Sequence, residues 1–315
     1  MKRFSRACFV TGAHVDLAGR LAGAPILHVS NPGRVERQPG GAGLNAASVA
    51  VALGLDSAIA GPVGTDAAAG ELKVEVRRRG ITDALAAMHG RATGSYTAIM
   101  APDGEMVIGL ADLSIHEAAD AGWLFARCGA ALHGAGLWFL MTNSLEPTLE
   151  ELSERGKADG KLLAAATITP AKAVRLRPVL GQLDLLFTNV AEARALTGLD
   201  RAGGRHLAEA LAQSGVAAGA ISAADGPLTW WRDGATGALQ PPPVPRVADV
   251  NGAGDALAGA TLAGLARGFG LDDALRAGIA AAQLTLGVPE PFHAGIDWPQ
   301  VEALAAKIAP PSEAG

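Results

Sequence analysis

Short apolar runs alternate with helical patterns along most of this 315-residue chain, and this alternation constrains the fold more than any other feature. Each run is short and bounded by turn residues, as buried strands are. The clearest runs are Cys8–Thr11, Ser57–Ala60, Leu137–Met141, Leu162–Ala166, Leu183–Thr188 and Ala218–Ser222. Strands that alternate with helices predict βαβ units, and therefore a mostly parallel sheet with helices on both faces.

Two segments interrupt the alternation. The first is His14–Pro39, and the second contains the apolar runs Tyr96–Met100 and Met106–Leu110 around Pro102-Asp103-Gly104. An Asp-Gly pair between two such runs is a strong hairpin signal. We therefore expect a small antiparallel layer outside the main sheet, formed by segments of roughly 14–40 and 92–113. No repeat or long linker divides the chain, so residues 1–315 are predicted to form a single domain.

Composition excludes several classes of protein. Hydrophobic residues make up 49% of the chain, which excludes a largely disordered protein. The net charge of −5 argues against a nucleic-acid binder. Cys8 and Cys128 are too few for a disulfide framework or a structural zinc site. The apolar stretches are too short to export or anchor the chain, so we expect a cytoplasmic protein without membrane contact.

The segment Asp249-Val250-Asn251-Gly252-Ala253-Gly254-Asp255 directly precedes a predicted helix that continues to Ala266. Small residues at the start of a helix expose backbone N–H groups, which bind phosphate or a developing oxyanion. A carboxylate there suits a general base that deprotonates a hydroxyl. Ordinary helix capping explains the same residues, because Asp and Gly are both common at helix starts.

A second glycine cluster, Gly40-Gly41-Ala42-Gly43-Leu44-Asn45, precedes a helix predicted over Leu44–Leu53. It lacks the Lys-Ser/Thr pair of a Walker A loop, and no dinucleotide fingerprint follows the first strand. Taken alone, this cluster indicates only a tight turn.

Together the two clusters resemble the signatures of the ribokinase-like (PfkB) family of sugar and nucleoside kinases. The first signature is matched by Gly40, Gly41, Gly43, Asn45, Ala47, Gly54 and Gly64. The second is matched by Asp249, Val250, Gly252, Ala253, Gly254, Asp255, Gly259 and Ala260, with Thr261 departing from it. The resemblance implies a three-layer α/β/α sandwich with a mostly parallel central sheet and a small antiparallel β lid.

The resemblance also implies roles for individual residues in an ATP-dependent kinase that uses Mg²⁺ and sometimes K⁺. Asp255 is the expected general base, and the Gly252-Ala253-Gly254 turn the expected anion hole. The substrate-binding positions are Asp16, Asn31, Gly40, Gly41 and Asn45. The nucleotide-binding positions are Asn189, Glu192, Gly226 and Asn251, with Glu192 acting on Mg²⁺ through water and Asp249 as a possible K⁺ ligand.

Simpler structural explanations remain for several of these residues. Glu192 lies where an acidic side chain complements a helix dipole, and Asp16 and Asp249 fit ordinary turns. The chain also departs from common family residues at Ala166, Ala223, Asn251 and Leu257. The departures at Ala166 and Ala223 leave the details of nucleotide contact open.

The loops resemble most the pseudouridine-kinase branch of the family, through Ser30–Val35, Thr93–Tyr96, Ala111–Leu113 and Leu176–Pro178. The resemblance thus favours a pseudouridine-like nucleoside as acceptor, with ribose, a fructose phosphate or a keto-deoxy sugar as alternatives. A weakly active relative that only binds such molecules, and a dinucleotide-dependent oxidoreductase, are the rival classes. A homodimer through the lid is a family-level expectation.

Overall fold

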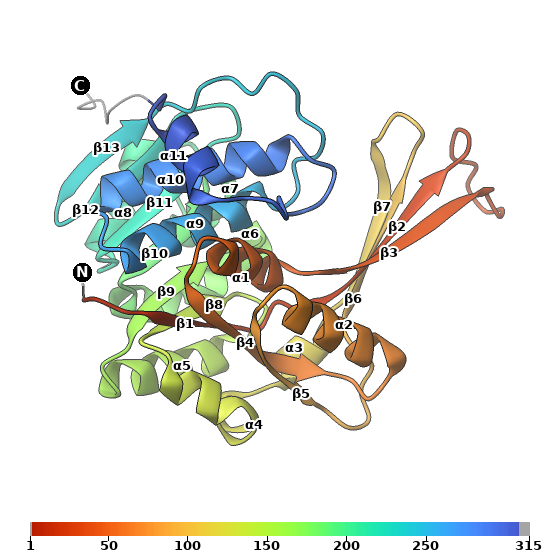
Figure 1. The fold of residues 1–315 in the computed structure, drawn as a ribbon, viewed down its shortest axis with the longest axis horizontal. Coiled ribbons are helices and arrows are strands. Elements are labelled where there is room, and N and C mark those ends of the chain that lie inside the picture. Colours follow the sequence, from red (N-terminus) through yellow and green to blue (C-terminus); the bar gives the residue numbers. More distant parts are fainter. Residues whose placement is uncertain (1, 309–315) are drawn as a thin grey trace.

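The central sheet occupies the middle of the computed structural model, which describes residues 2–308 (Figure 1). Within those residues its nine strands lie in the order β13-β12-β11-β10-β9-β8-β1-β4-β5. The strands from β11 to β5 pair in parallel, and β12 and β13 add antiparallel strands at one edge. Their bounds are β1 Arg6–Val10, β4 Asp56–Val63, β5 Thr82–Ala87, β8 Leu137–Met141, β9 Leu162–Ala166, β10 Leu185–Asn189, β11 Ala218–Ser222, β12 Leu228–Arg232 and β13 Ala235–Leu239.

Helices cover both faces of this sheet, because successive strand residues point to opposite sides. On β1, Phe9 packs into one apolar core, whereas Cys8 and Val10 pack into the other. One face is covered by α1 Ala42–Ala52, α2 Ala67–Arg78, α9 Ala253–Ala266, α10 Leu271–Leu286 and α11 Trp298–Ala305. The other is covered by α4 Ala121–Gly134, α5 Glu146–Ala158, α6 Pro170–Ala173, the 3₁₀ helix η1 Val174–Gln182, α7 Val190–Thr197 and α8 Gly204–Gln213. The expected three-layer α/β/α sandwich is confirmed.

A second, four-stranded sheet projects from the body and forms the lid (Figure 1). Its order is β3-β2-β6-β7, with bounds β2 His14–Leu21, β3 Gly33–Gly40, β6 Ser95–Met100 and β7 Met106–Asp112. Two of its pairings are antiparallel, as expected, but the central pairing of β2 with β6 is parallel. Both of these strands run outward from the body, whereas β3 and β7 return to it. The short helix α3, Ser114–Ala118, follows the lid.

Several helices begin earlier than the apolar pattern predicts. The helix predicted from Leu44 begins as α1 at Ala42. The α2 helix begins at Ala67, because the Asp66 carboxylate accepts a 3.0 Å hydrogen bond from the Ala69 N–H and caps it. The α9 helix likewise begins at Ala253, within the glycine-rich turn. No helix among residues 2–308 is long and apolar enough to cross a bilayer.

Candidate active site

The glycine-rich turn before α9 forms the centre of the site. Gly252 adopts the left-handed conformation (φ 79°), and a Cβ at this position would lie 1.7 Å from the Pro291 carbonyl oxygen. Only glycine fits this combination of conformation and space. The first backbone bond of the helix runs from the Ala256 N–H to the Gly252 oxygen, so the preceding N–H groups have no partner within the helix.

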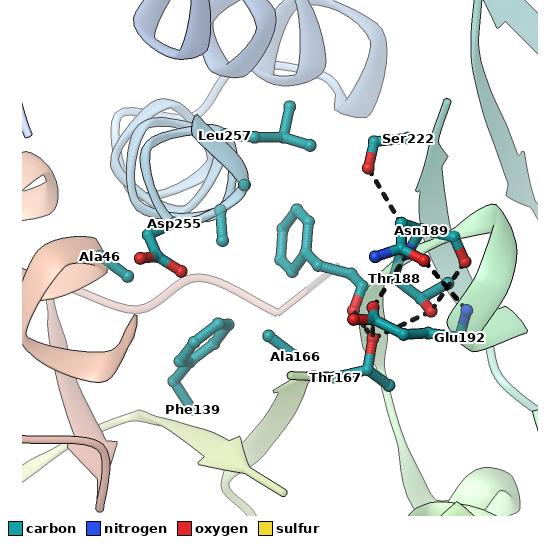
Figure 2. A pocket seen from close by; sticks show the side chains of 13 residues that line it. Ala46, Phe139, Ala166, Thr167, Thr188, Asn189, Glu192, Ser222, Asp255 and Leu257 are labelled. Carbon is teal, nitrogen blue, oxygen red and sulfur yellow. Dashed lines mark hydrogen bonds between the residues drawn. The ribbon is translucent and has the colours of Figure 1, made fainter. Parts of the chain in front are cut away.

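Asp255 lies in the first turn of α9 and points into a cavity (Figure 2). Its Oδ2 accepts a 2.9 Å hydrogen bond from Asn45 Nδ2 on α1. The two helices approach closely because Gly259 of α9 has no side chain; a Cβ there would lie 2.3 Å from the Ala46 oxygen. The structure therefore joins the two glycine-rich signatures through a direct contact between their polar residues.

The environment of Asp255 raises the pKa of its carboxyl from 3.8 to about 7. Desolvation by burial is the largest cause of this rise, and the negative charges of Asp16 and Glu192 add to it. The Asn45 hydrogen bond and His14 act in the opposite direction. A carboxyl with a pKa near neutrality is suited to accept a proton from a hydroxyl.

Asp16 lies on β2 at the root of the lid, beside the first glycine cluster. Its carboxylate fills the space above Gly40, where a Cβ would lie 1.9 Å from Oδ2. His14 Nε2 lies 3.1 Å from Asp16 Oδ1, and a Cβ on Gly41 would lie 2.9 Å from His14 Nδ1. The two glycines therefore make room for a His14–Asp16 pair. No sequence motif marks His14; the only signal is its spacing of two residues from Asp16 on a strand, which places both on one face.

A second buried histidine, His116, packs against His14. The rings of His14 and His116 meet edge to face with their centroids 6.2 Å apart. His116 is 1% exposed, and neither ring nitrogen has a hydrogen-bond partner within residues 2–308. Burial, followed by the charges of His14 and Lys172, lowers the pKa of His116 to about 3. His116 is therefore neutral at physiological pH.

Glu192 and Asn189 lie across the cavity from Asp255, at the carboxyl end of β10 (Figure 2). They form a capping box: the Glu192 N–H donates to Asn189 Oδ1, and the Asn189 N–H donates to Glu192 Oε2. Thr167 Oγ1 also donates to Glu192 Oε2, at 2.5 Å, and lies 2.9 Å from Thr188 Oγ1. Neither threonine was predicted from the sequence, although Thr167 directly follows the departure from the family pattern at Ala166.

Two adjoining cavities lie between and beside these groups. The first, of about 150 Å³, separates Asp255 from the Glu192 cluster, and Ala166 contributes to its wall. The second, of about 720 Å³, shares Ser222, Gly254 and Leu257 with the first. Its remaining lining is mostly apolar and comes from the loop at Ala223–Gly226, the proline-rich segment that begins at Gln240, and α10.

The structure does not bring every expected site residue to these two cavities. Asn31 lies at the distal end of the β2–β3 hairpin, where its side chain bonds the backbone of Ile26 and Val29. Asp249 is half-buried, and its Oδ1 accepts from the N–H of Asn251, which is itself exposed. Gly226, by contrast, lines the larger cavity.

The donor set fits a magnesium ion that keeps most of its waters. No group of three or more His, Cys, Asp or Glu side chains among residues 2–308 forms a closed metal site. One carboxylate, from Glu192, and the hydroxyls of Thr167, Thr188 and Ser222 instead border the smaller cavity opposite Asp255. Mg²⁺ in phosphoryl-transfer sites is commonly held by one or two carboxylates, water and the phosphates themselves.

Known structures with the same fold cover nearly the whole chain. A carbohydrate kinase from Agrobacterium tumefaciens has a TM-score of 0.88 and 33% sequence identity, covering 98% of this chain and 99% of that one. The ribokinase of Arabidopsis thaliana, solved with ribose and ATP, has a TM-score of 0.83 and 18% identity, covering 96% of this chain and 98% of that one. The fold is therefore ribokinase-like.

Sequence similarity identifies the family. The pattern of the pfkB family carbohydrate kinases matches residues 10–293, so the chain belongs to this family. Its kinases are phosphotransferases that act on sugar hydroxyls. Among curated proteins, the pseudouridine kinase of Escherichia coli K12 is 26% identical over 213 residues, which are 67% of each chain.

Proposed function

We propose that this protein is an ATP-dependent kinase that phosphorylates a primary hydroxyl of a sugar or nucleoside, with a pseudouridine-like nucleoside as first choice. The observation that carries the proposal is the position of Asp255: a carboxyl with a pKa near 7 beside the free N–H groups of a helix start. A base and an anion-binding site in contact are what phosphoryl transfer to a hydroxyl requires.

The acceptor is proposed to lie between Asp255 and the root of the lid. Asp16 accepts hydrogen bonds from its other hydroxyls, which places the reacting hydroxyl at Asp255. Asn45 donates to Asp255 Oδ2, so Oδ1 takes the proton while the hydroxyl oxygen attacks the γ-phosphorus. The bond between the γ-phosphorus and the β,γ-bridging oxygen breaks, and ADP leaves with that oxygen. The N–H groups of the Gly252-Ala253-Gly254 turn then stabilise the negative charge on the phosphoryl oxygens.

The nucleotide is proposed to occupy the larger cavity, with its phosphates directed toward Gly254. The apolar lining suits a purine, and the cavity joins the Asp255 cavity at three shared residues. Relatives solved with nucleotide support this proposal: the Arabidopsis ribokinase was solved with ATP, and a putative ribokinase from Escherichia coli with ATP and Mg²⁺. Bound Mg²⁺ would neutralise phosphate charge beside Glu192.

The lid is further proposed to join two copies of the chain. Register places Leu17, Val35, Ile99, Ile108 and Leu110 on the lid face turned away from Asp16. Val35, Ile108 and Leu110 are 72%, 63% and 68% exposed. A second copy that packs on this face would remove a continuous apolar patch from water.

The proposed function is tested by Asp255→Asn, which keeps the size of the side chain and removes the base. We expect kcat for ADP release with the best acceptor to fall about 10²- to 10⁴-fold, the usual contribution of a general base. The screen covers pseudouridine, uridine, ribose, fructose 6-phosphate and keto-deoxy sugars. A near-wild-type rate in the variant would exclude Asp255 as the base, and absence of turnover with all acceptors would favour a binding protein.

A further inference from the structure

The lid face that carries Asp16 bears a row of side chains at its root. Asp16 of β2 pairs with Gln38 of β3 on one side and with Tyr96 of β6 on the other. Residues directly opposite each other on neighbouring strands share a face of the sheet. The three side chains therefore lie side by side on the face where Asp16 meets the candidate site.

Tyr96 lies across the sheet toward β7. A Cβ on Gly109 would lie 2.8 Å from the Tyr96 hydroxyl oxygen and 3.4 Å from Cζ. The hydroxyl lies 3.4 Å from Met106 Sδ and donates to it. The far end of the ring thus covers the backbone of Gly109, and the side chain lies along the sheet instead of projecting from it. The opposite ring face is turned away from the sheet, on the same side of the lid as Asp16.

Tyr96 also stands out because the lid segments contain few aromatic side chains. It is the only tyrosine, and residues 14–40 and 92–113 contain no Phe or Trp. On the other side of the lid, the exposed side chains of Val35, Ile108 and Leu110 are aliphatic. A partly exposed aromatic ring therefore occurs only on the lid face that carries Asp16.

We propose that Tyr96 is a stacking platform for a planar ring of the acceptor, and that the acceptor is therefore a nucleoside instead of an unsubstituted sugar. This inference rests on the proposed function. A ribose held through its hydroxyls by Asp16 carries its base on a neighbouring carbon. Adjacent strands lie about 4.8 Å apart, and the Tyr96 ring leans from β6 over Gly109 of β7, so a base that stacks on it extends about one to two strand spacings from Asp16. Aromatic stacking accepts any base, so pyrimidines and purines can both use the platform.

The test compares kcat/KM for a nucleoside and for ribose in the wild type, Tyr96→Leu and Tyr96→Phe. We use pseudouridine and uridine as nucleosides, with ADP release as the readout. In Tyr96→Leu, the ratio of nucleoside to ribose kcat/KM should fall about 10- to 100-fold, mainly through the nucleoside KM, as expected for the loss of one base–aromatic stack. Tyr96→Phe is the matched control: it keeps the ring and loses only the hydroxyl contact with Met106, so its ratio should stay within about threefold of the wild type.

Each other outcome overturns the proposal in a recognisable way. An equal fall with ribose and nucleosides in Tyr96→Leu would mean that Tyr96 only supports the lid. A fall in Tyr96→Phe as large as in Tyr96→Leu would mean that the hydroxyl, not the ring, acts on the substrate. Turnover of ribose or another sugar without turnover of any nucleoside would overturn the platform and leave the proposed kinase intact. Failure of the proposed function itself would appear as no acceptor-dependent ADP release at all.

Discussion

At the scale of single residues, Asp255, the proposed general base, is a carboxylic acid whose ionisation the structure opposes. Its ionised form is destabilised by burial and by two neighbouring carboxylates, and is stabilised by Asn45 and His14. A base of this kind is protonated below its pKa and then cannot accept a proton. We therefore expect kcat/KM to fall about tenfold per pH unit below pH 7, with a midpoint close to the pKa of about 7.

A pH profile of kcat/KM for the best acceptor, measured between pH 5 and 9, checks this expectation. The profile of kcat/KM reports the free enzyme, which is the state described by the structure. A rate that is constant down to pH 5 would mean that Asp255 has an ordinary pKa or is not the base.

The same pKa predicts how Asp255 affects stability. The folded carboxyl binds its proton more tightly than the unfolded one, so its contribution to stability is largest at low pH and is lost as the pH rises from about 4 to 7. Asp255→Asn resembles the protonated form at every pH. The variant should therefore melt at a higher temperature than the wild type at pH 8, and the difference should shrink toward pH 5 in scanning calorimetry.

His14 is expected to affect substrate binding through Asp16. Its Nε2 is 3.1 Å from the Asp16 carboxylate, and the pair is packed against Gly40 and Gly41. His14→Leu removes the polar contact with the Asp16 carboxylate, so the acceptor KM should rise about 10-fold, with a smaller change in kcat. His14→Gln places an amide donor at a similar reach and should recover most of the loss. An equal KM in the Leu and Gln variants would exclude the polar contact with Asp16 as the cause.

The sequence predicted the site residues that belong to continuous motifs. Asp255, the Gly252 turn and the Asn189–Glu192 element are local patterns, and each lies at a helix start as expected. His14, His116, Thr167 and Thr188 become neighbours of these residues only after folding. Their contacts depend on the spacing of strand ends and on the absence of a Cβ at glycines, and neither is visible in a linear pattern.

At the scale of elements, the conformation at the start of α9 depends on Gly252 more than on Gly254. Gly252→Ala places a Cβ against the Pro291 carbonyl in a left-handed conformation, so helix and loop must separate. We expect a loss of stability of about 1–3 kcal/mol, and a lower kcat because the N–H groups move. Gly254→Ala is the matched control for stability, since a Cβ there meets nothing within 4 Å.

The free energy of unfolding of the two variants, measured in urea, tests whether contact with Pro291 causes the loss of stability. Equal losses of stability in Gly252→Ala and Gly254→Ala would mean that any substitution in the turn is harmful, and that contact with Pro291 is not the cause. The alanine at 254 should even match or slightly exceed the wild type, because alanine is favoured over glycine inside a helix.

The order of the elements was easier to predict than the pairing within the lid. Apolar runs and helix stops identify the sheet and its helices, because burial of both strand faces makes each run almost continuously apolar. The lid strands are exposed, so the sequence of a strand such as β3 shows little apolar alternation. The parallel pairing of β2 with β6 joins segments that are remote in the sequence, and only the folded chain reveals it.

At the scale of the whole molecule, the two faces of the lid serve two separate proposed functions. One lid face carries Asp16 and Tyr96 toward the site, and the other carries exposed aliphatic side chains. Alternation along each strand therefore allows one sheet both to contact an acceptor and to bind a second copy. Association of two chains would then fix the lid relative to the body and preorganise the acceptor site.

The proposed dimer gives the last prediction. At micromolar concentration, sedimentation should give a mass near twice the 31.7 kDa of the chain. Leu110→Glu puts a charge on the apolar lid face and should produce monomers, with a higher acceptor KM because the lid is no longer held. Leu199→Glu is the matched control, because this leucine is 42% exposed in the loop after α7 and lies away from the lid. A monomeric wild type, or a Leu110→Glu variant that sediments like the control, would exclude the lid as the interface.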